Sequence, residues 1–161
     1  MLEGSLLPRT LAELRHALAE GHRHFPGLRL FDLDGVDLDL SHCVLRGGCL
    51  REARFGRASL AQAEVEGCAF HRSLLWGADL SGLRGGGSYW QEADLSFALF
   101  QGANLQQADL RGAALYGANF SRADLRGADL RAQDLRECQL QGALLEGALL
   151  EEAHLPEGLN F

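Results

Sequence analysis

Large apolar residues recur at every fifth position along most of the chain, and this spacing dominates the sequence. Of the 24 residue numbers divisible by five from Leu40 to Leu155, 21 hold Leu or Phe, and the exceptions are Val65, Gly85 and Trp90. A period of five matches neither the helical repeat of about 3.6 residues nor the strand repeat of two. The pattern therefore predicts neither an amphipathic helix nor a flat strand, but an uninterrupted array of five-residue units.

Each unit carries a small residue, mostly Ala, two positions before the large one, and a polar residue usually stands between them. Residues two apart in an extended segment point to the same side, so the small and large side chains are expected to face inward. The other two residues of the unit are expected to turn the chain. Four such corners predict a coil of about 20 residues that shares backbone hydrogen bonds with neighbouring coils about 4.8 Å away.

The five-residue segments ADLRG, ANFSR and ADLSG resemble the units of the pentapeptide repeat family, whose motif is commonly written A(D/N)LXX. This resemblance covers roughly residues 36–155 and implies a right-handed quadrilateral β-helix. We therefore expect an all-β solenoid of about six coils, formed by residues 31–155 as one body. The resemblance implies little about activity, because a shared fold does not determine function.

A short helix is predicted ahead of the array, within an N-terminal segment of residues 1–30. Thr10 and Glu13 match a helix capping box and Gly21 suits a helix end, so the helix should span about residues 10–20. Its expected role is to cover the end of the first coil, which is apolar and carries unpaired backbone N–H and C=O groups.

The other end is predicted to close with a tail, residues 156–161. Pro156 cannot donate a backbone hydrogen bond and should end the pairing between coils. Leu159 and Phe161 are then expected to fold over the last coil.

Two units depart from the pattern. In SGLRGGGSYW the large residue is missing at Gly85, while Leu83 stands at the small position. Because this exchange keeps the core volume nearly constant, we predict a filled core with a local bulge at Gly85–Gly87; a hinge or a binding notch is the alternative. Gln133 places a long amide at a small inward site, where it must find hydrogen bonds or tilt the chain outward.

The four cysteines are predicted to be reduced thiols. Cys43, Cys68 and Cys138 occupy inward small positions on different sides or coils, whereas Cys49 occupies an outward one. Free cysteine behaves as a small buried hydrophobe, so the inward three are expected to take the place of Ala.

No catalytic or cofactor-binding motif emerges. A calcium loop needs Gly at its sixth position and Glu at its twelfth, and the acidic run FDLDGVDLDL does not lead into such a loop. His22 and His24 lack a Cys or acidic partner at a metal-ligand spacing, and RGGGSYW lacks the Lys and Ser or Thr of a phosphate loop. We expect a non-enzymatic protein with no cofactor and no metal.

Targeting signals are not evident either. The chain has no apolar run of about 18 residues, and its opening MLEGSLLPRT lacks the long apolar core of a secretory signal. We therefore expect a cytoplasmic protein that does not cross a membrane.

The negative net charge of −7 suggests a second hypothesis, that the protein mimics DNA. Some pentapeptide repeat relatives resemble duplex DNA, bind DNA gyrase and protect it from quinolones or toxins, so the resemblance implies this role as an alternative. Residues 40–157 hold 15 acidic residues and 11 arginines, a balance of −4. Duplex DNA would carry about 17 negative charges along a rod of about 28 Å, so the match is poor.

Local charge pairing weakens the mimicry hypothesis further. An outward Asp often precedes Arg by two positions, and such pairs largely neutralise each other; the pairs are Asp109 with Arg111, Asp124 with Arg126, Asp129 with Arg131, and Asp134 with Arg136. We favour a protein-binding scaffold whose partner is unknown, and expect no direct binding to nucleic acid.

Three aromatic residues are predicted to form a partner-binding patch. With 20 residues per coil, the units around residues 75, 95 and 115 stack in one column, and their outward residues include Trp76, Phe97 and Tyr116. Trp and Tyr are enriched at binding hot spots. The alternative is that these rings only shield the backbone or meet the terminal helix.

The last coil predicts a homodimer. Leu144 and Leu149 stand where most units have a polar outward residue, so two adjacent sides of this coil present apolar side chains. The resemblance to relatives that dimerise end to end implies a two-fold interface that buries these leucines together with Phe161. A monomer whose tail folds back is the alternative.

Overall fold

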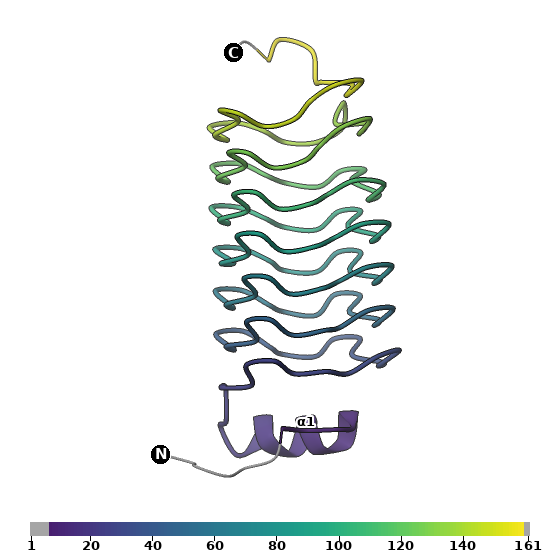
Figure 1. Ribbon diagram of the computed structural model, residues 1–161, viewed down its shortest axis with the longest axis vertical. Helices are drawn as coiled ribbons and strands as arrows, with labels where there is room; N and C mark the ends of the chain where they lie inside the picture. Colours follow the sequence, from purple (N-terminus) through teal and green to yellow (C-terminus); the bar gives the residue numbers. More distant parts are fainter. Residues whose placement is uncertain (1–6, 160–161) are drawn as a thin grey trace.

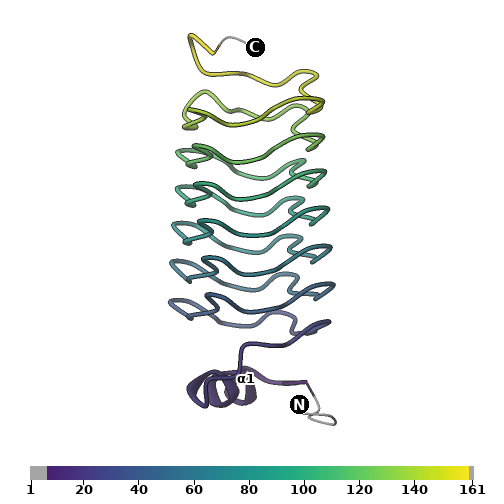
Figure 2. The same ribbon diagram turned by 90° about the vertical axis from the view of Figure 1, so that its left-hand side faces the viewer.

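A computed structural model describes residues 7–159, which form a helix followed by a straight column of stacked coils (Figures 1 and 2). Helix α1 spans Leu11–Ala19 at one end of the column. Parallel bridges join residues 20 apart, beginning with His24 to Val44 and ending with Asp134 to His154. The predicted four-sided coil of 20 residues is therefore confirmed, although its ladder begins at His24 rather than at residue 31.

The sides of each coil are too short to form continuous strands. Only three residues lie between successive corners, so within residues 7–159 a side contributes at most a single parallel bridge to each neighbouring coil. Backbone hydrogen bonds between coils are nevertheless regular: Leu80 N–H donates to the Leu99 carbonyl oxygen at 2.7 Å, and Asp79 N–H donates to that of Ala58 at 3.0 Å. These repeated short sides give the column its stiffness.

Each corner is a two-residue turn. At the Ser96–Phe97 corner, Ala98 N–H donates to the Leu95 carbonyl oxygen at 3.0 Å, and Phe97 has a φ of 58°. The second corner residue adopts this left-handed conformation in unit after unit, and Glu137 is an exception. Glycine takes this conformation without steric cost, which explains why it often stands there.

The turns also explain why Asp or Asn recurs in the five-residue repeat unit. The N–H of the first corner residue lies outside the ladder between coils and needs another acceptor. The Asp94 carboxylate accepts from Ser96 N–H at 3.0 Å, and the Asn119 amide oxygen accepts from Ser121 N–H at 2.9 Å. A short acceptor two residues before the donor is therefore a local requirement of the corner.

Large side chains fill the axis of the column, and aromatic rings stack in its middle. The rings of Phe70 and Trp90 lie parallel with centroids 4.2 Å apart, and those of Phe100 and Phe120 lie parallel at 4.8 Å. Trp90 meets Phe100 edge to face at 6.1 Å. All four side chains are fully buried, so they contribute strongly to stability.

The predicted bulge at Gly85–Gly87 is wrong, whereas the predicted filled core is confirmed. Arg84 forms bridges to both neighbouring coils, and Ser88 N–H closes the corner onto the Gly85 carbonyl oxygen at 3.1 Å. Leu83 is fully buried, and a Cβ atom at Gly85 would lie 3.1 Å from its Cδ2 atom. The large and small residues change places on the same inward side, so the backbone does not need to move.

The ladder is interrupted at Gln133 instead. Residues 114 and 134 lack the bridge that their neighbours form, and the N–H groups of Leu115, Gly117 and Asp134 have no backbone acceptor within residues 7–159. The buried amide of Gln133 takes over part of the ladder: its nitrogen donates to the Ala113 carbonyl oxygen at 2.7 Å, and its oxygen accepts from Gly112 N–H at 2.9 Å.

The side chain that directly follows the interruption is more exposed. The Asp134 side chain is 55% exposed, whereas that of Asp109, at the corresponding place in another unit, is 17% exposed. The corner at Glu137, which does not adopt positive φ, follows directly. Of the two alternatives for Gln133, the first is confirmed, because its amide finds hydrogen bonds.

Helix α1 begins as predicted. The Thr10 hydroxyl accepts from Glu13 N–H at 3.2 Å, and Leu14 and Leu18 are buried against the first coil. Glu13 does not complete the capping box, since its carboxylate accepts from Arg9 N–H at 2.6 Å. At the opposite end Leu159 packs partly buried on the core, and Phe161 lies outside the described residues.

The cysteines occupy the predicted places, and all four are free thiols. Cys43, Cys68 and Cys138 are buried, and this burial raises the pKa of Cys43 to about 11 and those of Cys68 and Cys138 to about 12. The Cys68 Sγ atom donates to the Leu45 carbonyl oxygen at 2.9 Å. These thiols therefore stay protonated at neutral pH and act as packing groups.

Candidate partner-binding surface

The structure brings the predicted aromatic residues to one corner of successive coils. Bridges from Leu74 to Asp94 and from Asp94 to Ala114 align the three units that carry them. The exposed fractions are 42% for Trp76, 58% for Phe97 and 59% for Tyr116. Trp76, the first of the three along the chain, lies in the third coil of the ladder that begins at His24, so this corner runs along the side of the column and not at the end covered by helix α1.

The rings of Phe97 and Trp76 lie against glycines of neighbouring corners, where the absence of a Cβ atom leaves room for them. A Cβ atom at Gly117 would lie 2.7 Å from the Phe97 ring, and one at Gly56 would lie 2.7 Å from the Trp76 indole nitrogen. Phe97 and Tyr116 meet edge to face, with centroids 5.4 Å apart and planes at 84°. The rings thus shield glycine backbone on one side and still present their other side to solvent.

Two exposed leucines extend this surface, and the sequence analysis missed both. Leu74 is 42% exposed and Leu99 is 39% exposed, one on each of the two sides that meet at the aromatic corner. Their signal in the sequence is an apolar residue at the outward position that often holds Asp or Asn. We call the surface formed by these five residues the corner ridge: Leu74, Trp76, Phe97, Leu99 and Tyr116.

An arginine continues the corner ridge toward helix α1. The Arg57 guanidinium carbon lies 5.3 Å from the centroid of the Trp76 ring, a cation–π arrangement. Arg57 also donates two hydrogen bonds to the Asp37 carboxylate, at 2.8 and 2.7 Å. This bidentate pair lowers the pKa of Asp37.

The predicted Asp–Arg pairs all form. In each, the arginine of the corner folds back on the carboxylate two residues earlier, with Nη2–Oδ2 distances of 2.6 to 2.7 Å, in Asp109–Arg111, Asp124–Arg126, Asp129–Arg131 and Asp134–Arg136. The arginine hydrogen bonds lower the pKa values of Asp124, Asp129 and Asp134. Much of the negative charge on the column is therefore paired locally.

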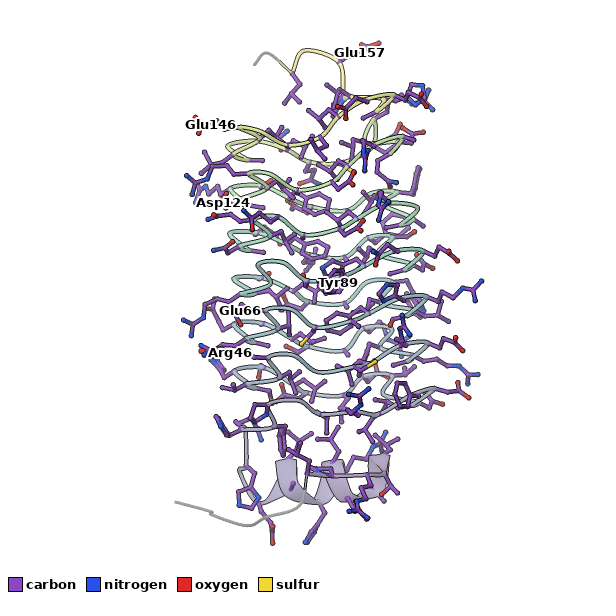
Figure 3. All side chains as sticks on the ribbon, viewed as in Figure 1. Arg46, Glu66, Tyr89, Asp124, Glu146 and Glu157 are labelled. Atoms are coloured by element: carbon purple, nitrogen blue, oxygen red, sulfur yellow. The ribbon has the colours of Figure 1, made fainter. Side chains whose placement is uncertain are left out.

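The last coil is open and acidic. Leu144 is 47% exposed and Leu149 is 39% exposed, and the inward leucines of this coil are only partly buried. No Lys or Arg follows Arg136 in the sequence, whereas several glutamates do; Glu146 and Glu157 are seen at this end in Figure 3. Phe161, the third residue of the predicted dimer interface, lies outside the described residues.

Residues 7–159 contain no group of three or more His, Cys, Asp or Glu side chains arranged to hold a metal ion. A hollow of about 900 Å³ lies beside helix α1, and His16, His22 and His24 line it together with Glu20. His16 and His22 each lie within 4 Å of the Glu20 carboxylate, at 3.5 and 3.7 Å. In the described part of the chain, no helix has the length and apolar character needed to cross a membrane.

Comparison with known proteins identifies the family. The family model for pentapeptide repeats matches residues 39–77 and 92–131 in eight copies. The chain is 30% identical to alr5209, a pentapeptide repeat protein from Nostoc PCC 7120, over 97% of this chain and 93% of that one, with a TM-score of 0.40. The chain belongs to the pentapeptide-repeat family.

Other solved pentapeptide-repeat proteins are similar at lower identity. QnrB1, a plasmid-mediated fluoroquinolone resistance protein, is 19% identical over 83% of this chain and 84% of that one, with a TM-score of 0.53. HetL from Nostoc sp. strain PCC 7120, which is involved in heterocyst differentiation regulation, is 22% identical over 96% of this chain and all of that one, with a TM-score of 0.41. A search of curated proteins found no match.

Proposed function

We propose that this pentapeptide-repeat protein is a non-enzymatic binding scaffold, a right-handed quadrilateral β-helix that presents the corner ridge to a protein partner. The observation that carries the proposal is the alignment of five exposed apolar side chains along one edge of the column. Single exposed apolar residues are common on protein surfaces, but a contiguous group marks an interaction site.

The fold suits this role because it holds the ridge in place before binding. Each ridge residue belongs to a unit bonded to the coil below, and all except Tyr116 belong to units that are also bonded to the coil above, so little backbone order has to be gained on association. Trp76 and Tyr116 are of the residue types that contribute most at hot spots.

Replacing Trp76 and Tyr116 with Ser is expected to weaken partner binding by at least about tenfold, because truncation of a hot-spot aromatic costs about 2 kcal/mol or more. The fold should persist, since both side chains project from the surface. Immobilised wild-type and variant protein can be compared for retention of the partner, with circular dichroism as the check on folding.

Tyr89→Ser is the matched control. Tyr89 is 45% exposed but lies in another column, with bridges to Ala69 and Asp109, and Figure 3 shows it on the face of the stack. Its replacement should leave retention unchanged. Equal retention by wild type and by the Trp76→Ser, Tyr116→Ser variant would remove the corner ridge from consideration.

A gyrase-directed role is the second candidate function. Its support is the similarity to QnrB1, a fluoroquinolone resistance protein, and the net charge of −7. The locally paired Asp–Arg corners oppose it, since a DNA mimic needs uncompensated carboxylates. Supercoiling assays with purified DNA gyrase, with and without a quinolone, test it: inhibition or rescue at micromolar protein would favour this role, and inertness would exclude it.

We also propose that two copies associate through their last coils into a two-fold symmetric dimer. Leu144 and Leu149 expose apolar surface on adjacent sides of that coil, and the inward leucines behind them are incompletely covered. Burying each exposed leucine contributes about 1.5 to 3 kcal/mol. The two-fold arrangement would let the same patch meet itself.

Light scattering should give about twice the chain mass of 17.5 kDa for the wild type. The Leu144→Asp, Leu149→Asp variant should be monomeric, because each Asp would have to be buried without a partner. Leu74→Asp with Leu99→Asp introduces the same charges away from the last coil and should stay dimeric. A wild-type chain that scatters as 17.5 kDa at millimolar concentration would contradict the dimer.

A further inference from the structure

Two carboxylates beside the corner ridge lack the arginine that pairs with Asp109, Asp124, Asp129 and Asp134. Asp79 and Asp94 each accept a hydrogen bond from the N–H of a corner serine, Ser81 and Ser96, at 3.0 Å. Where Arg follows instead of Ser, as in Asp124–Arg126, the arginine closes on the same carboxylate. Neither Asp79 nor Asp94 forms an ion pair within residues 7–159, so each keeps an oxygen free.

These carboxylates lie on the two sides that meet at the ridge. Asp94 forms a bridge with Leu74 in the coil below, and Asp79 forms one with Leu99 in the coil above. Each is therefore the neighbour, about 4.8 Å away along the column, of an exposed ridge leucine. Both residues are partly buried already, so a partner that covers the ridge would cover them too.

The two arginines at corners of the same column are already engaged. Arg57 is held by the Asp37 carboxylate through two hydrogen bonds, and Arg136 by the Asp134 carboxylate at 2.6 Å. A partner with only apolar groups would leave Asp79 and Asp94 buried without compensation, which is costly. A partner that brings cations would pair them, and the exposed aromatic faces attract cations as well.

We propose, on the basis of the partner-binding role of the corner ridge, that its partner is a protein segment carrying both apolar and cationic side chains. The apolar groups would cover the ridge leucines and rings. Arg or Lys side chains would bind the free oxygens of Asp79 and Asp94. The combination distinguishes this surface from the last coil, which is acidic but has no aromatic residue in the described part.

Replacing Asp by Asn removes the negative charge but keeps the side-chain oxygen that accepts the corner hydrogen bond. Asn119 stands at the same place in its unit and accepts the corner N–H bond as Asp does, so Asp79→Asn with Asp94→Asn should leave the fold unchanged. The matched control is Asp34→Asn with Asp39→Asn, which removes the same two charges from the first coil. Asp39 caps Ser41 N–H at 2.9 Å in the same manner.

Short labelled peptides of alternating Leu and Arg, Leu and Gln, or Leu and Glu serve as probes in fluorescence anisotropy titrations. We expect the Leu–Arg peptide alone to bind wild type, with an affinity that falls at rising salt. The Asp79→Asn, Asp94→Asn variant and the Trp76→Ser, Tyr116→Ser variant should each bind it at least about tenfold more weakly. The first-coil control should bind like wild type.

Several outcomes would overturn the cationic assignment: equal binding of the Leu–Gln peptide, preference for the Leu–Glu peptide, or equal losses in the ridge and first-coil variants. The last would mean that the Leu–Arg peptide responds to overall charge only. Retention of the cellular partner separates the two proposals. Loss of the partner with the aromatic variant but not with the Asn variant would keep the corner ridge and reject its cationic partner.

Discussion

We expect Gly85→Leu to destabilise the protein by about 1 to 3 kcal/mol or more, because its side chain would enter a filled core. A Cβ atom alone would lie 3.1 Å from Leu83 Cδ2 and 3.2 Å from Leu105 Cδ2. Leu83→Ala, which empties the small position, should cost about 2 to 5 kcal/mol. Combined, the two changes restore the usual order of small and large residues, so the double variant should recover part of the loss.

Urea unfolding of the wild type, both single variants and the double variant measures this coupling. The double variant should be more stable than the sum of the single losses by about 2 kcal/mol, within the range for residues in direct contact. Gly85→Leu combined with Leu140→Ala, in a distant coil, serves as the control and should show additive losses. Additivity for the Leu83 pair would show that the two positions do not share one volume.

The second expected result is a more stable protein after Gln133→Ala. Ala fills the equivalent place in the coil below, at Ala113, and in the coil above, at Ala153. Without the long amide, the ladder should close between residues 112–117 and 131–137. Backbone bonds would then replace the two bonds of the amide, a net gain of about 1 to 2 kcal/mol at about 1 kcal/mol for each added bond.

Amide hydrogen exchange locates the effect. The N–H groups of Leu115, Gly117 and Asp134, which have no backbone acceptor in the described structure, should exchange at least about tenfold more slowly in the variant. Gln107→Ala replaces an exposed corner glutamine and should leave these rates unchanged. If Gln133→Ala instead lowered stability and left exchange at these three sites as fast as before, the amide would be a tie between coils rather than an interruption.

The five-residue repeat unit was sufficient to predict the architecture of stacked coils. A fixed spacing of large and small inward residues admits one stacking of coils, so the 20-residue coil and the inward cysteines followed from position alone, whereas the helix followed from its own capping residues. The column of Trp76, Phe97 and Tyr116 followed from the same numbering, since residues 20 apart are neighbours, and the Asp–Arg pairs followed from their spacing of two within one unit. In such a fold sequence separation translates directly into distance.

The structural effects of deviations from the repeat unit depended on packing in three dimensions. Whether Leu83 could occupy the space opposite Gly85 without a bulge depended on side-chain volumes contributed by other coils, such as Leu105. Gln133 disrupts the ladder because its amide reaches backbone groups of the coil below, a competition that no local pattern reveals. The extent of the corner ridge likewise became visible only when Leu74 and Leu99 were seen on either side of one corner, because exposure depends on which neighbours cover a side chain.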